Sequence, residues 1–136
     1  MAHVTRITDT VSGKQPLKFH TGAEVAKSVV VDNDAITADT YGRKLVVKGE
    51  LLTKITATGL YGPYSRTAVD GRATIALGTA VIANEDADVQ LGDKAIGGYY
   101  HNCVFDASEC TLHKIAGHAD PLATLRTAFP TCTWDD

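Results

Sequence analysis

Cysteine and histidine side chains gather in one segment of this sequence, and they are the residues with which chemistry could begin. Cys103, Cys110, His113 and His118 form a possible four-ligand set for zinc, because thiolate sulfur and imidazole nitrogen are its preferred donors. Structural zinc sites place two cysteines about two to four residues apart in a tight turn. Here six residues separate the cysteines. We therefore expect buried thiols and surface histidines, and we predict no metal site.

The same segment could supply a cysteine nucleophile. Cys103 or Cys110 would need a base within hydrogen-bond reach, such as a nearby histidine held by Asp106. The flanking residues match no signature of a cysteine enzyme. We expect no catalytic residue and no cofactor, and a small enzyme using residues 103–118 stays as one alternative.

Three aspartates faintly resemble the start of a calcium loop: Asp32, Asp34 and Asp39. Such a loop also needs further oxygen ligands, a pivotal glycine and a closing glutamate, and the pattern fails after two acids. Turn formation explains these aspartates better, because Asp side chains accept hydrogen bonds from nearby backbone amides. The acids of residues 85–88 likewise indicate a solvated loop.

Tyr61 and Tyr64 lie in the stretch "TGLYGPY" and could stack on a sugar or a base. Its glycines form no phosphate cradle, since neither a Lys-Ser/Thr pair nor a helix start follows them. Tyrosine beside Gly-Pro is more often part of a packed turn or an anchor in a protein interface. A glycan-binding or adhesion module is therefore a second alternative.

Composition narrows the classes of partner. The chain has 136 residues, which fits one domain, and a formal net charge of −3. No cluster of Lys and Arg exceeds a dipeptide, so we expect no nucleic-acid partner. We also expect no membrane segment and no signal peptide, because no apolar run is long enough. The three cysteines are an odd number, which favours reduced thiols over a secreted disulfide framework.

The elements that would position these residues are mostly strands. Residues 1–24 are polar, threonine-rich and broken by Pro and Gly, which predicts an extended N-terminal arm. The β-forming runs are "SVVV" at residues 28–31, "KLVVKGELLTKITATG" at residues 44–59 and "AIGGYYHNCVF" at residues 95–105. Gly49 predicts a bend inside the second run. The fold class is thus a mixed, β-rich α+β domain.

Asp70 and Gly71 predict a hairpin between "SRTAV" and "ATIALGTAVIA", since type I′ turns need residues that tolerate positive φ. On the second of these strands, small residues would share one face: Ala76, Gly78 and Ala80. A stripe of small residues lets another layer approach closely, so we assign these positions to packing between subunits.

The stretch "DPLATLRTAF" predicts a short C-terminal helix. Asp120 suits the N-cap, Pro121 suits the first helical position and Pro130 ends the helix. An apolar stripe at helical spacing lies between them: Leu122, Leu125 and Phe129.

The order of these motifs resembles the lambda-type head decoration proteins of tailed bacteriophages. In "GELLTKITATGLYGPYSRTAVDGRATIALGTAVIANEDAD", a K-[IV]-T-A-T-G strand end is followed by a Tyr/Pro turn, a T-x-x-D-G hairpin, an apolar strand and an acidic D-x-D loop. "AIGGYYHNCVFDASECTL" is similar to the following strand of that family, and "DPLATLRTAF" to its C-terminal helix. The likeness covers about residues 23–129.

The resemblance implies a small head-decoration domain, here residues 25–136, and a structural protein without enzymatic activity. Its members form homotrimers, bind the major capsid protein on the outside of the expanded head at three-fold and quasi-three-fold sites, and act as cement against DNA pressure. The implied location is the virion surface, after synthesis in the host bacterial cytoplasm.

The arm is the candidate for gripping the capsid. An extended polar segment can add a strand to an exposed sheet edge, where main-chain hydrogen bonds provide affinity. The capsid-binding residues that we assign to it are Val4, Thr5, Arg6, Ile7 and Thr8, with Val4 and Ile7 entering pockets.

Overall fold

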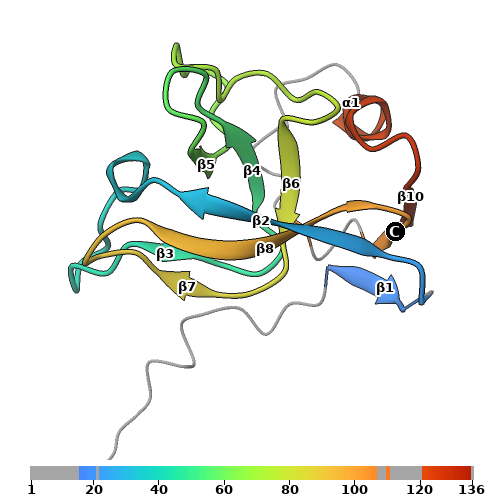
Figure 1. Cartoon of the computed structure of the whole chain (residues 1–136), viewed down its shortest axis with the longest axis horizontal. Coiled ribbons are helices and arrows are strands. Elements are labelled where there is room, and N and C mark those ends of the chain that lie inside the picture. Colours follow the sequence, from blue (N-terminus) through green and yellow to red (C-terminus); the bar gives the residue numbers. More distant parts are fainter. Residues whose placement is uncertain (1–15, 21, 107–109, 111–120, 136) are drawn as a thin grey trace, which may run out of the picture.

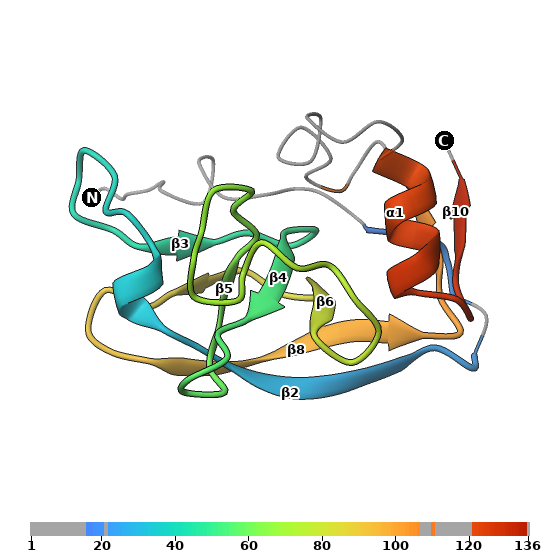
Figure 2. The same cartoon turned by 90° about the horizontal axis from the view of Figure 1, so that it is seen from above.

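The computed structural model describes residues 16–20, 22–106, 110 and 121–135, and they form a small β-rich domain (Figures 1 and 2). Within this part of the chain, one α-helix accompanies the strands. The elements are β1 (Leu17–Phe19), β2 (Val25–Val31), η2 (Asn33–Ala35), β3 (Leu45–Val46), β4 (Leu51–Lys54), β5 (Tyr61–Pro63), β6 (Ala80–Ala83), β7 (Ala87–Asp88), β8 (Lys94–His101), β9 (Val104–Asp106), α1 (Pro121–Ala128) and β10 (Thr133–Asp135). None of the helices described is long and apolar enough to cross a membrane.

A closed barrel with the strand order β2-β5-β4-β6-β8 forms the centre of the domain. Its longest pair is β2 with β8, which run antiparallel and lie side by side in both views (Figures 1 and 2). The β-branched residues of β2 favour an extended backbone. Along this strand Val29 and Val31 are buried while Ser28 and Val30 are exposed, as expected when alternate side chains point to opposite faces.

Strands β4 and β6 separate two hydrophobic cores. Successive residues of β4 divide between them, because Leu51 belongs to one cluster and Leu52 to the other. In β6, Ile82 packs in the first cluster and Val81 in the second. The second cluster is the barrel interior. The first, which we call the outer core, lies between the barrel and the C-terminal elements.

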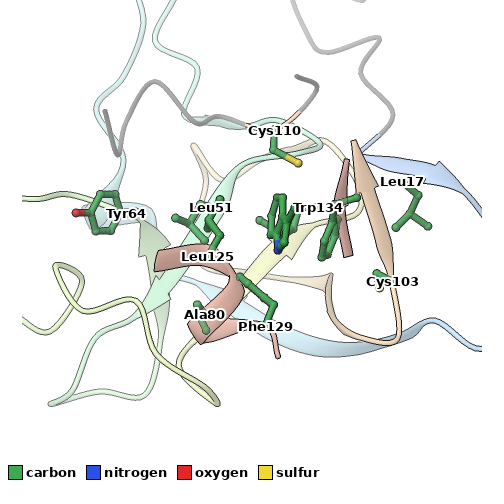
Figure 3. Packing of buried hydrophobic residues seen from close by; sticks show 12 residues of the cluster. Leu17, Leu51, Tyr64, Ala80, Cys103, Cys110, Leu125, Phe129 and Trp134 are labelled. Atoms are coloured by element: carbon green, nitrogen blue, oxygen red, sulfur yellow. The ribbon is translucent and has the colours of Figure 1, made fainter. Parts of the chain in front are cut away.

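The outer core is closed by α1 and by a three-stranded sheet with the order β1-β9-β10 (Figure 3). Leu125 and Phe129 of the helical segment are fully buried there. Phe105 of β9 stacks on Trp134 of β10 with ring centroids 4.5 Å apart, and meets Phe129 edge-on at 5.9 Å. Each such side chain contributes roughly 1.5–3 kcal/mol by leaving water.

The predicted helix and the bend at Gly49 are confirmed. Pro121 is the first residue of α1, and Pro130 follows its end. Gly49 has φ of +92° and divides the predicted long run into β3 and β4. The expected N-cap, Asp120, lies outside the described residues, as does the side chain of Leu122.

Three strand predictions are wrong. The run expected over residues 95–105 is divided into β8 and β9 by a turn at Asn102, where φ is +55°. The run expected to continue through Ala57 ends at Lys54, and Ala57 lies exposed in a turn. The turn at Asp70-Gly71 is present, with φ of +110° at Gly71, but residues 65–79 contain no strand. The turn is packed instead against the end of β4, where the backbone amide of Thr56 donates to Asp70 O at 2.9 Å. The turn is thus hydrogen-bonded to the segment that follows β4 and not to a hairpin partner.

Candidate functional site

The structure brings Cys103 together with Cys132, a residue that the sequence analysis did not assign to any site. Cys103 lies in the turn between β8 and β9 and is 2% exposed, and Cys132 precedes β10 and is partly exposed. The two thiols are close enough for each to shift the pKa of the other. The backbone also joins them, because Thr133 N donates to Cys103 O at 2.9 Å. Cys103, Cys110 and Cys132 form no disulfide in the structure.

Polar groups surround this pair on one side. The Cys103 thiol donates to the backbone oxygen of His101 at 3.3 Å. Thr131 Oγ1 lies 2.7 Å from His101 Nδ1, and the Thr131 side chain is also hydrogen-bonded to Cys132. A chain of hydrogen bonds therefore runs from a histidine ring through a hydroxyl to two adjacent sulfurs.

The four residues considered for zinc are not shown to converge. Cys103 and Cys110 both pack in the outer core, where Cys110 lies close to Trp134 (Figure 3). His113 and His118 are outside the described residues. Among the residues that the structure does describe, no three His, Cys, Asp or Glu side chains are grouped to hold a metal ion.

The aspartates considered for calcium form turns, as expected. Asp32 caps the short helix η2 by accepting from Asp34 N at 2.9 Å. Asp39 accepts from the backbone amides of Tyr41 and Arg43 at 2.8 and 3.0 Å and from Arg43 Nε at 2.9 Å. Desolvation acts to raise the pKa of Asp39, but these hydrogen bonds outweigh it and lower the pKa below its ordinary value.

The two tyrosines of the Gly-Pro stretch are packed residues. Tyr61 is 6% exposed and contributes to the barrel interior, and Tyr64 is 3% exposed in the outer core. Burial raises the pKa of the Tyr64 hydroxyl. Neither ring offers a free face on which a sugar or a base could stack.

The arm residues assigned to capsid binding, Val4, Thr5, Arg6, Ile7 and Thr8, lie outside the described residues. The structure does describe the base of the arm. Pro16 and Leu17 are buried, and Asp106 N donates to Pro16 O at 2.7 Å. Strand β1 pairs antiparallel with β9, with Leu17 opposite Phe105. The segment expected to be an arm through residue 24 is therefore joined to the body from residue 16.

The stripe assigned to subunit packing is not a strand face. Ala76 and Gly78 lie in the irregular segment before β6, and Gly78 adopts φ of +85°. Ala80 begins β6 with its side chain 2% exposed, facing α1 and Phe129 in the outer core (Figure 3). The alternation that would align these residues needs an extended backbone, which this segment does not have.

Loops on the described surface expose large apolar side chains. Val69 and Leu77 are 101% and 66% exposed on the segment between β5 and β6, and Tyr41 and Leu91 are 78% and 99% exposed on two other loops. Those two loops are joined, because Val89 N donates to Lys44 O at 2.9 Å. These tips are the described apolar side chains most available to a partner.

Comparisons with family models, with curated proteins and with solved structures found no match for this chain.

One sequence signal could have identified Cys132. The stretch "TCTW" alternates polar threonines with Cys132 and Trp134, a period of two that is typical of a half-buried strand. In the structure Thr131 and Thr133 are exposed, Cys132 is partly exposed and Trp134 is buried, and the strand β10 begins at Thr133.

Proposed function

We propose that this chain is a bacteriophage capsid decoration protein, which binds the outside of the expanded head as homotrimers at three-fold and quasi-three-fold sites and acts as cement. The order of motifs along residues 49–88 supports this function. The structural observation that carries it furthest is the fixed base of the N-terminal arm.

A partner that is bound to the arm would be connected to the folded body through the base of the arm. Pro16 and Leu17 are buried, and β1 is hydrogen-bonded to β9 beside the aromatic rings of the outer core. Residues 1–15 therefore precede a segment that is packed against the folded body. An extended segment held in this way can complete an exposed strand edge of the major capsid protein.

Three symmetric copies would multiply a modest contact. Once one arm of a trimer is bound, the others are held at a high effective concentration near their sites. A protein that binds the expanded shell more tightly than the unexpanded one stabilises the expanded state by mass action. Exposed Val69 and Leu77 replace the small-residue stripe as the candidate contacts between subunits.

The test is co-sedimentation with expanded, DNA-free heads of the phage that encodes the chain. The full chain should sediment with expanded heads, and a chain lacking residues 2–15 should do so at least tenfold more weakly. Val4→Ser with Ile7→Ser should also weaken binding. The matched control, Thr5→Ala with Thr8→Ala, should bind as the full chain does, because main-chain bonds provide most of the affinity.

Light scattering and images of decorated heads test the trimer. We expect three-fold density at the three-fold and quasi-three-fold sites. A chain that is monomeric both in solution and on the shell contradicts the trimer. Failure of the full chain to bind expanded heads contradicts the proposed function as a whole, whereas equal binding by the truncated chain moves the grip to the body.

A further inference from the structure

Cys103 and Cys132 are the residues immediately before two parallel strands, β9 and β10. The register pairs Thr133 with Val104, and the two cysteines are the preceding residues on each side. Neighbouring strands lie about 4.7–4.9 Å apart, which falls within the Cα separation of roughly 4.4–6.8 Å that a disulfide accepts. The backbone joins the two positions, because Thr133 N donates to Cys103 O at 2.9 Å, and each of the two thiols shifts the pKa of the other.

The two thiols differ in exposure and in acidity. Cys132 is the more exposed, and Cys103 is 2% exposed behind it. The interaction with the Cys103 side chain lowers the pKa of Cys132 to about 7, and the side chain of Thr131 also lowers it. The interaction with the Cys132 side chain raises the pKa of Cys103, and burial raises it further. Cys132 is therefore the first of the pair to ionise.

Other titratable groups near the pair lie on β8 and next to β2. His101 reaches Cys132 through Thr131. Tyr99 has a pKa raised by burial, then by Cys103 and by Glu24. Because neither Tyr99 nor Cys103 is ionised near neutral pH, Cys132 is the thiol of this group that titrates there.

We propose that Cys132 and Cys103 form a redox-active dithiol, which a low-molecular-weight disulfide such as oxidised glutathione converts to an intramolecular disulfide. The Cys132 thiolate attacks one glutathione sulfur, the glutathione disulfide bond breaks, and one glutathione thiolate leaves. Cys103 then loses its proton and attacks the Cys132 sulfur of the mixed disulfide, releasing the second glutathione. The protein loses two electrons and two protons, and one oxidised glutathione becomes two reduced molecules.

The disulfide would join the turn between β8 and β9 to the start of β10. The closed loop includes α1, so the bond would restrict the unfolded chain and hold the C-terminal elements against the outer core. This inference is independent of the proposed function, since it rests on the positions of two side chains within one subunit.

Intact mass and thiol counts after treatment with oxidised glutathione test the chemistry. The full chain should lose two hydrogens and two free thiols and retain no glutathione. Cys103→Ala should instead accumulate one bound glutathione, because the resolving thiol is absent. Cys132→Ala should react at least tenfold more slowly, and the control Cys110→Ala should behave as the full chain. Persistence of three free thiols in the full chain, or an equal reaction rate in Cys132→Ala, overturns the proposal.

Two further measurements separate this role from a structural one. In the Cys110→Ala chain, the rate of Cys132 alkylation should reach half its maximum near pH 7. In the Cys103→Ala, Cys110→Ala chain, the half-maximal rate should move to about pH 8.5, the ordinary pKa of a thiol. Oxidation should raise the Tm of the full chain and of Cys110→Ala by roughly 5–15 °C. An alkylation profile unchanged by Cys103→Ala, or an oxidised Tm at or below the reduced value, contradicts the proposal.

Discussion

At the scale of single residues, the turn at Asp70-Gly71 is held by a local ion pair and by hydrogen bonds to more distant segments. Arg72 Nε bonds the Asp70 carboxylate at 3.1 Å, and Arg72 Nη1 donates to Pro63 O at 3.2 Å. The hydroxyl of Thr53, which is fully buried, donates to Arg72 O at 2.7 Å. The turn therefore connects β4 with the end of β5, and its geometry depends on the glycine at its centre.

Gly71→Ala should destabilise the domain by about 2–4 kcal/mol. A β-carbon there would lie 3.0 Å from Lys54 O and would also clash with Thr56 Oγ1, on a backbone with φ of +110°. The cost adds steric overlap to the roughly 1–2 kcal/mol of the left-handed conformation. Gly78→Ala is the matched control, because φ is +85° but the added carbon meets nothing within 4 Å. Chemical denaturation should show the larger loss for Gly71→Ala, and equal losses would contradict this account.

At the scale of elements, α1 packs against the outer core through one of its faces. Leu125 is fully buried and Phe129, just after the helix, is fully buried beside it, whereas Arg126 and Thr127 are exposed. An eight-residue helix is too short to be stable alone in water, so its stability comes from packing against the outer core.

Leu125→Ala should lower the free energy of unfolding by about 2–5 kcal/mol, since it leaves a cavity where the side chain meets the outer core. Arg126→Ala, one position along on the exposed face, should change it by less than about 0.5 kcal/mol. Urea denaturation of both variants decides the ranking. If Arg126→Ala proves the more damaging, the helix does not pack as the structure shows.

Local and non-local elements differ in how far the sequence predicts them. The helix is predicted because its signals, Pro121, the apolar spacing and Pro130, act within a few residues. Thr74, Ile75 and Thr79 favour an extended backbone, but residues 72–79 form no strand, because pairing depends on partners elsewhere in the chain. The contact between Cys103 and Cys132 follows from the parallel pairing of β9 with β10, which no local pattern encodes.

At the scale of the whole molecule, the first and the last described strands, β1 and β10, both pair with β9. Strand β9 has β1 on one side and β10 on the other. Thus residues 17–19 complete a sheet whose other members come from the last part of the sequence. Removing the residues that precede β1 and removing β1 itself should therefore have different effects on the stability of the domain.

Deleting residues 2–15 should leave the domain folded with nearly unchanged stability, whereas deleting residues 2–19 should cost about 2–4 kcal/mol. The second truncation removes the buried residue Pro16, takes Leu17 out of the outer core and uncovers one edge of β9, where Asp106 N donates to Pro16 O. Thermal and chemical denaturation of both truncations measure the difference. Leu17→Ser in the full chain is the matched control and should account for most of the loss, because it removes the buried side chain and keeps the strand. Equal stability of the two truncations would mean that β1 does not hold the base of the arm, and the arm could then not transmit binding to the body.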